Sequence, residues 1–328
     1  MDLVGTIDTG PYFIEGVATM CDLLTMKGGH FFMSFKNLLR LAVFSISSLS
    51  MVACNSSTSN GTTVTISGTN YDIEVSKLVV GMECNYAPFN WTDNASNDYN
   101  VKIANATGYG DGYDIQITKK LAEIMNIDFE IQAIEWDSLI TDCQMNSINM
   151  VIAGMTDTEE RRKSIAFTDE YYHSEVVLIA NKTVADQYTG KTLGKSDLTT
   201  LLKGKNVISQ KETVEDEMIN GFVTEYGCIH AAANETYGGA AYDVSTGVAD
   251  FLTVELPVAN TYVSTFTNLG IIHLDQNVLG VDASELGVSI GINKNNTGLQ
   301  SALNAALKLI STEDRNTLMQ GAVERSSN

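Results

Sequence analysis

The feature that most constrains the fold is an alternation of short apolar runs with amphipathic segments between residues 77 and 153. In the longer segments apolar residues recur at mostly helical spacing, whereas the shorter runs are continuous or alternating. They predict strands at residues 77–82, 129–134 and 150–153, with helices at 113–126 and 136–145. Connections of this length fit right-handed crossovers, so the pattern predicts an α/β fold with a parallel sheet.

The segments that follow these strands carry polar and aromatic residues. The loop ECNYAPFNWT at residues 83–92 follows the first strand, Trp136 follows the second, and a turn from Gly154 to Arg161 follows the third. In open sheets of this kind, ligands bind beyond the carboxyl ends of the strands. We therefore expect the three segments to converge on one binding rim.

The stretch MVIAGMTDTEERRKSIAFTDEYY, residues 150–172, predicts an anion site. Its apolar run reaches Gly154 and Thr156 and then enters a charged helix, and such a helix entry leaves unpaired main-chain N–H groups. Arg161 lies five residues beyond Thr156 and can fold back over the same spot. Its guanidinium would bind a carboxylate or phosphate bidentately. The alternative interpretation is a surface helix with a solvated charge cluster.

The N-terminal region is typical of an export signal. Lys36 and Arg40 precede an apolar, serine-containing segment at residues 41–53 that is too short for a standard membrane span. Cys54 follows directly. The pattern resembles a bacterial lipoprotein signal at residues 33–53 with Cys54 as the lipidated residue, although Met51 replaces the usual leucine. An ordinary cleaved signal and a single anchor helix are the alternatives.

We expect residues 1–32 to be a leader or a non-native extension, and residues 54–74 to be a polar tether. Acidic residues outnumber basic ones by 40 to 20, and the resulting formal charge of -20 opposes binding to nucleic acid or anionic lipid surfaces. Cys84, Cys143 and Cys228 show no metal-ligand spacing, so we expect no metal site and no cofactor.

The second half of the chain predicts another α/β unit. A strand at residues 204–210 leads to Thr213, a plausible helix N-cap, and to a helix at 215–226. A strand at 251–254 ends at Glu255. A strand at 287–293 precedes helices at 299–310 and 311–320.

Five motifs, in order, give a specific resemblance. They are GMECNYAPFNW (81–91), GYDIQITKKLAEIM (112–125), EWDSLI (135–140), AGMTDTEERRKSIAFTDEYY (153–172) and ADFLTVELPVA (249–259). Over about residues 75–325 the chain resembles the bacterial extracellular solute-binding proteins of amino-acid ABC importers, family 3. The resemblance implies a type II periplasmic-binding-protein-like fold, in which two α/β lobes, each a mostly parallel sheet flanked by helices, are joined by two crossing strands. Lobe 1 would comprise residues 75–175 and 285–328, and lobe 2 residues 176–284.

The resemblance also implies a ligand site made of Glu83, Tyr86, Trp136, Gly154, Thr156, Arg161, Thr213 and Glu255. Arg161 would bind the α-carboxylate of an amino acid, helped by main-chain groups at Gly154 and Thr156 and by Thr213 from the other lobe. Glu255 would accept hydrogen bonds from the α-ammonium. A zwitterion removed from water needs both charges paired, because unpaired buried charges cost several kcal/mol.

Tyr86 and Trp136 would hold the ligand side chain between them, and Glu83 would meet its polar end. Such a site would suit a polar or cationic side chain, lysine or arginine before glutamine. The chain departs from its relatives at Ala153 and Gly154, where serines are frequent, and the side-chain hydroxyl contacts are lost there. Lys211 and Glu212 also replace a Gly-Ser/Thr pair before Thr213.

The resemblance implies a lipid-anchored, extracytoplasmic receptor that captures an amino acid and delivers it to the permease of an ABC importer with its ATPase subunits. An enzyme is a second hypothesis, because a few relatives with this fold catalyse eliminations on cyclic substrates. The sequence shows no nucleophile–base pair that would favour it. A sensor domain that works through a separate partner protein is a third hypothesis.

Overall fold

The computed structural model describes residues 61–282 and 286–327. The chain divides into two units, Met1–Ser56 and Ser57–Asn328, and all described residues belong to the second unit. The expected leader at residues 1–32, the lipoprotein signal at 33–53 and Cys54 lie outside the described residues. So do residues 55–60 of the expected tether.

Lobe 1 is built on a five-stranded sheet with the order β10-β17-β9-β3-β8. Its strands are β3 (Lys77–Met82), β8 (Asp128–Ala133), β9 (Met150–Val151), β10 (Ala166–Tyr172) and β17 (Val288–Ile292). The three strands predicted first, β3, β8 and β9, pair in parallel as expected. The returning strand β17 pairs antiparallel with both β9 and β10, so the sheet is mixed.

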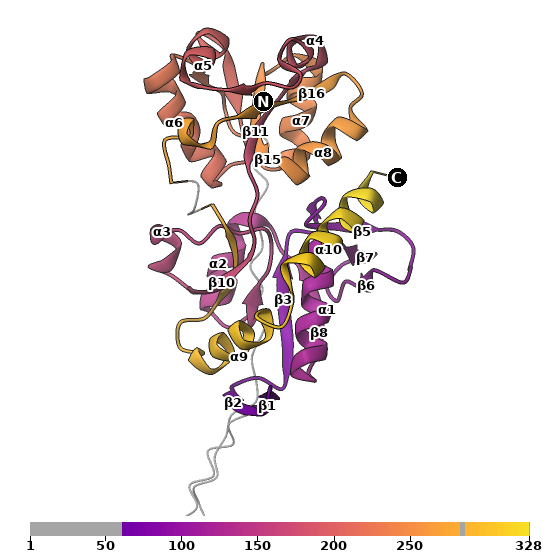
Figure 1. The fold of residues 1–328 in the computed structure, drawn as a ribbon. Helices are drawn as coiled ribbons and strands as arrows, with labels where there is room; N and C mark the ends of the chain where they lie inside the picture. Colours follow the sequence, from indigo (N-terminus) through magenta and orange to yellow (C-terminus); the bar gives the residue numbers. More distant parts are fainter. Residues whose placement is uncertain (1–60, 283–285, 328) are drawn as a thin grey trace, which may run out of the picture. The chain divides into compact units, whose positions relative to one another are not determined.

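The helices of lobe 1 come from both ends of the described chain. They are α1 (Tyr113–Met125), η1 (Trp136–Ser138), α2 (Leu139–Gln144), α3 (Glu159–Arg162), α9 (Thr297–Leu307) and α10 (Thr312–Ser326). The apolar face of α1, with Ile117 and Leu121, is fully buried, and the helix ends where Asn126 adopts a left-handed conformation with φ of 49°. Both C-terminal helices contact α1 (Figure 1).

Lobe 2 is built on a six-stranded sheet with the order β12-β16-β11-β15-β13-β14. Its strands are β11 (Val176–Asn181), β12 (Thr192–Leu193), β13 (Asn206–Ile208), β14 (Ile229–His230), β15 (Phe251–Glu255) and β16 (Leu269–Leu274). Its helices are α4 (Lys182–Ala185), η2 (Asp186–Tyr188), α5 (Lys195–Leu202), α6 (Val214–Tyr226), α7 (Tyr237–Thr246), α8 (Leu256–Thr265) and η3 (Gln276–Val278). β13 is parallel to its neighbours, whereas the entering strand β11 is antiparallel to β15 and β16.

The two sheets are connected where β10 of lobe 1 continues through residues 173–175 into β11 of lobe 2. The chain returns to lobe 1 between η3 and β17, a segment that includes residues outside the described part. The proposed lobe limits at 175/176 and 284/285 stay a prediction. One hydrophobic core contains buried residues of both lobes, and a second core lies within lobe 2.

Residues 62–73 form a β-hairpin where the sequence predicted part of a polar tether. β1 (Thr62–Ile66) pairs antiparallel with β2 (Thr69–Ile73), and the hairpin contacts α9 and α1. Val64, Ile66 and Ile73 are almost completely buried. The tether prediction was therefore wrong for this part of the range, because alternating apolar residues give one face of a polar-looking segment a core to pack against.

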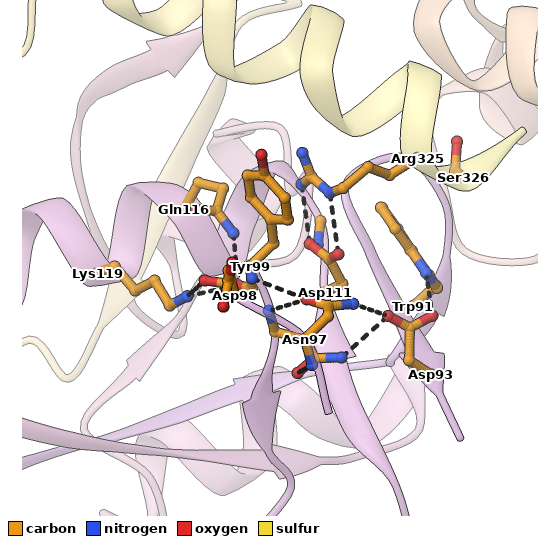
Figure 2. A network of polar contacts seen from close by, with 12 residues as sticks. Trp91, Asp93, Asn97, Asp98, Tyr99, Asp111, Gln116, Lys119, Arg325 and Ser326 are labelled. Carbon is orange, nitrogen blue, oxygen red and sulfur yellow. Dashed lines mark hydrogen bonds and ion pairs between the residues drawn. The ribbon is translucent and has the colours of Figure 1, made fainter. Parts of the chain in front are cut away.

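The polar, Asn-rich segment after β3 also has a regular structure. β4 (Asn85–Tyr86), β5 (Asn90–Asp93), β6 (Val101–Lys102) and β7 (Tyr109–Asp111) form a four-stranded sheet with the order β4-β5-β7-β6. Arg325 at the end of α10 binds Asp111 through two hydrogen bonds of 3.0 and 2.9 Å, and its guanidinium lies 4.3 Å from the ring centroid of Tyr99 (Figure 2). This pair fixes the C-terminal helix on lobe 1.

Three further observations concern the described residues alone. No helix in residues 61–282 or 286–327 is both long and apolar enough to span a bilayer. Within the same ranges no group of three or more His, Cys, Asp or Glu side chains is placed to hold a metal ion. Cys84, Cys143 and Cys228 are buried free thiols.

Candidate functional site

One cavity is lined by all eight residues that the sequence predicted for the ligand site. Glu83, Tyr86, Trp136, Gly154, Thr156 and Arg161 come from lobe 1, whereas Thr213 and Glu255 come from lobe 2. The lining also includes four residues of lobe 2 that the sequence did not predict: Gln210, Val214, Glu215 and Tyr237. The predicted segments therefore meet at one place.

Tyr86 connects the two lobes across this cavity. Its hydroxyl donates a hydrogen bond to the Glu255 carboxylate, and both side chains are buried. Its ring stacks on Phe89 at 5.2 Å and on Tyr237 at 5.1 Å between centroids. The ring that faces Tyr86 across the cavity is thus Tyr237 of lobe 2, where the sequence suggested Trp136.

Trp136 instead lies against Arg161, whose guanidinium is 5.2 Å from the centroid of the indole ring. Arg161 donates to two main-chain carbonyl oxygens, that of Thr156 at 2.7 Å and that of Glu212 at 3.1 Å. The Thr158 hydroxyl caps the short helix α3 that carries it. The side chain therefore folds back over Thr156, as its spacing predicted, and it also reaches lobe 2.

The main-chain groups around Gly154 differ from the predicted anion site. The Gly154 N–H donates to the Tyr171 hydroxyl at 3.0 Å, and this hydroxyl donates to Asp114 at 2.7 Å. That N–H is already used within lobe 1. Gly154 has φ of 58°, and a Cβ atom there would lie 2.8 Å from the Tyr86 ring. A side chain at this position would displace Tyr86, which accounts physically for glycine at this position.

Glu83 follows β3 and meets lobe 2 through Gln210. The Gln210 amide donates to the Glu83 carboxylate at 2.9 Å and to the main-chain oxygen of Glu235 at 3.0 Å. Burial raises the pKa of Glu83 to about 7, against the lowering effect of the Gln210 hydrogen bond, and the charge of Glu135 raises it further.

Part of the lobe 2 face is formed by the first turns of α6 and α7. Thr213 is the N-cap of α6: its hydroxyl accepts from the Asp216 N–H at 3.2 Å and donates to the Gln210 carbonyl at 2.7 Å. The predicted N-cap is confirmed. In this structure the Thr213 hydroxyl uses its hydrogen bonds within lobe 2. Tyr237, the first residue of α7, donates to the Glu215 carboxylate at 3.0 Å.

The cavity is strongly acidic. It contains three buried carboxyl groups, on Glu83, Glu215 and Glu255, against one guanidinium on Arg161. Burial raises the pKa of Glu255 well above its usual value, and the nearby Glu215 charge raises it further. Burial also raises the pKa of Glu215 and lowers that of Arg161. A cation entering this cavity would relieve the cost of ionising these acids.

The cavity is also tightly filled. About 10 Å³ of it is free, which is roughly the space that one water molecule needs. An amino acid can therefore enter only when the side chains that meet across it, such as Tyr86 and Glu255, move apart.

Comparison with known proteins agrees with this architecture. The family model of the bacterial extracellular solute-binding proteins, family 3, matches residues 78–320. The chain belongs to this family. This solute-binding protein is 26% identical over 277 residues to the arginine-binding extracellular protein ArtP of Bacillus subtilis, over 83% of this chain and 92% of ArtP. It is 28% identical over 202 residues to ABC transporter arginine-binding protein 1 of Escherichia coli, over 62% of this chain and 76% of that protein.

A solved structure confirms the two-lobed fold. The amino acid ABC transporter substrate-binding protein AbpA of Streptococcus pneumoniae, bound to L-arginine, matches this solute-binding protein with a TM-score of 0.61 at 22% identity. The match covers 77% of this chain and 97% of AbpA.

Two of the unpredicted residues of this solute-binding protein carry a signal in the sequence, and a third does not. Glu215 lies two residues after the predicted N-cap Thr213, so the first turn of that helix could have been searched for side chains facing the cavity. Gln210 ends the strand predicted at 204–210 and could have been found by the strand-end rule. Tyr237 begins a helix far along the chain, and its place opposite Tyr86 depends on how the two lobes meet.

Proposed function

We propose that this solute-binding protein captures a basic amino acid, arginine or lysine before glutamine, and delivers it to the permease of an ABC importer. The observation that carries the proposal is the charge of the cavity, which places three buried carboxyl groups against one guanidinium. A basic amino acid brings two cationic groups and one carboxylate. It therefore leaves fewer buried charges unpaired than a neutral amino acid does.

Each charged group of the ligand has a partner in this proposal. The α-carboxylate binds Arg161. It takes the place of the Glu212 carbonyl of lobe 2, which accepts a hydrogen bond from Arg161 in this structure. The α-ammonium takes the place of the Tyr86 hydroxyl at Glu255. The cationic end of the side chain takes the place of the Gln210 amide at Glu83. In each exchange a neutral partner of a charged group is replaced by an ion of opposite charge, which strengthens the contact inside the buried cavity.

The other residues of the proposed site surround the ligand's side chain and its carboxylate end. Tyr86, once it is separated from Tyr237, and Trp136, which lies against Arg161, would offer ring faces to the alkyl and cationic parts of the side chain. Such a contact is worth about 0.5–2 kcal/mol for a cation. Thr213 and the main chain at Gly154 and Thr156 border the carboxylate end. The names of both curated relatives describe arginine-binding proteins, which supports the same ligand class.

The proposal extends to anchoring and delivery. Residues 33–53 would direct export and Cys54 would carry the lipid that holds the protein at the outer face of the membrane. Ligand contacts made by both lobes favour the closed arrangement, and the permease would recognise that arrangement. The proposal assigns no catalysis to the cavity, whose titratable groups are carboxyl groups, tyrosines and one arginine.

Calorimetric titration of the mature chain, residues 54–328, against each of the twenty amino acids tests the proposal. We expect arginine or lysine to bind most tightly, with dissociation constants well below millimolar, and glutamine more weakly. If no amino acid binds more tightly than about 1 mM, roughly -4 kcal/mol, the proposal is wrong. Tightest binding of an acidic amino acid would also contradict it.

A further inference from the structure

The α-ammonium of a bound amino acid has three N–H donors, and lobe 1 offers them no side-chain acceptor at positions 153 and 154. Ala153 and Gly154 have no side-chain oxygen, and the Thr156 carbonyl already accepts from Arg161. Glu255 of lobe 2 supplies one carboxylate. A second side-chain acceptor on the same face would complete the site, and the cavity contains one that no role above has used.

That unused acceptor is Glu215. It lines the cavity from the first turn of α6 and is only 6% exposed. Its charge raises the pKa of Glu255, and the Arg161 charge in turn lowers the pKa of Glu215. Glu215 lines the same cavity as the proposed ammonium partner Glu255 and the proposed carboxylate partner Arg161. In an amino acid these two ligand groups are attached to the same carbon, so one carboxylate can be near both.

Tyr237 holds this carboxylate in place. Its hydroxyl donates to Glu215 at 3.0 Å, and because both residues belong to lobe 2, this hydrogen bond does not depend on how the lobes move apart. A neutral donor of this kind orients the carboxylate without neutralising its charge. The remaining acceptor positions of the carboxylate can then serve a cationic ligand.

We propose that Glu215, oriented by Tyr237, is a second acceptor for the α-ammonium of the ligand and replaces the hydroxyl contacts that lobe 1 lacks at Ala153 and Gly154. The inference rests on the proposed function, since it assigns a further contact within the same amino-acid site. It makes Glu215 a ligand-binding residue and Tyr237 a positioning residue.

Titration with two ligands tests the inference. L-arginine carries the α-ammonium, and 5-guanidinopentanoic acid is the same molecule without it. We expect Glu215→Gln to weaken arginine binding by about tenfold or more, the loss of one charge-assisted hydrogen bond, and to change binding of the analogue by less than about threefold. Tyr237→Phe should have the same selective effect, only smaller, because it keeps the ring and the carboxylate.

Two matched variants control for indirect effects. Glu217→Gln removes an exposed charge of the same helix that also acts on Arg161, and Tyr226→Phe removes a lobe 2 hydroxyl that donates to the Val278 carbonyl. Neither should change the ratio of the two affinities. If Glu215→Gln weakens both ligands equally, or neither, the inference is wrong while the proposed function stands. If the wild type binds no amino acid, both are wrong.

Discussion

Glu83 is the residue whose protonation should control affinity most visibly. Burial raises the pKa of its carboxyl to about 7, the hydrogen bond from Gln210 lowers that pKa, and the charge of Glu135 raises it. A cationic side chain favours the ionised form, so binding releases a proton wherever Glu83 is protonated in the free protein. Affinity for arginine should therefore rise with pH up to about 7 and level off above it.

Between pH 6 and pH 8 we expect arginine affinity to increase by about tenfold through Glu83 alone. Glu83→Gln should bind arginine more weakly and should retain only the pH dependence that comes from Glu215 and Glu255. Calorimetric titration at the two pH values measures both effects. A variant that keeps the whole wild-type pH dependence would show that another group is responsible.

Removing Arg325 would measure the cost of leaving the buried charge of Asp111 unpaired. The Asp111 side chain is 1% exposed and its partner Arg325 is 21% exposed (Figure 2). Arg325→Ala should reduce the free energy of unfolding by about 3–5 kcal/mol, because the carboxylate stays buried without its cation. Urea denaturation measures this change.

Arg162 provides the comparison for Arg325, because it also binds an aspartate, Asp157, through two hydrogen bonds. Its side chain is 59% exposed, so Arg162→Ala should cost only about 0–1 kcal/mol. Equal losses in the two variants would show that burial does not decide the value of these pairs.

At the scale of elements, the predictions from sequence succeeded where periodicity was strong. β3 was predicted to the residue, and α1 and α6 each to within one residue at either end, because buried strands and amphipathic helices have clear patterns. The strand β10 and the four-stranded sheet β4–β7 were not predicted. Their residues are polar or aromatic, and tertiary contacts such as the Arg325–Asp111 pair stabilise them.

In the candidate site, too, residues within local motifs were predicted and contacts between distant segments were not. Residues within sequence motifs, such as Arg161 and Glu255, line the cavity where expected. The main-chain anion site differs, because the Tyr171 hydroxyl takes the Gly154 N–H, and the aromatic partner of Tyr86 is Tyr237. Both differences depend on contacts between segments far apart in the chain, which local spacing does not encode.

The hairpin β1–β2 gives a prediction at the element scale. Ile73 is 1% exposed within it, so Ile73→Ala should reduce the free energy of unfolding by about 2–5 kcal/mol. Arginine affinity should not change, because the hairpin contributes no residue to the cavity. Thr69→Ala, at an exposed position of the same strand, should change stability by less than about 0.5 kcal/mol. Equal, small losses would mean that the hairpin packs only weakly on lobe 1.

For the whole molecule, the buried acids couple stability to pH. Burial raises the pKa of Asp114 to about 7, as it does for Glu83. Because these folded-state values lie above those of the unfolded chain, the stability that the acids contribute is present at low pH and is lost as the pH rises through about 7. Each group changes the free energy of unfolding by up to about 1.4 kcal/mol per pH unit.

Without ligand, Tm should therefore be lower at pH 8 than at pH 6. With saturating arginine the stabilisation should be larger at pH 8, because the ionised cavity binds the cation more tightly. Thermal unfolding at the two pH values, with and without arginine, measures both trends. A ligand-free Tm that increases from pH 6 to pH 8 would contradict this account.

Calorimetric titration of three proteins with L-arginine tests most directly whether the cavity between the two lobes binds an amino acid through Arg161. We predict binding clearly tighter than millimolar for the wild type, no detectable binding for Arg161→Ala, and an affinity within about twofold of wild type for Arg162→Ala, its exposed neighbour. Unchanged arginine affinity in Arg161→Ala would show that the ligand binds elsewhere.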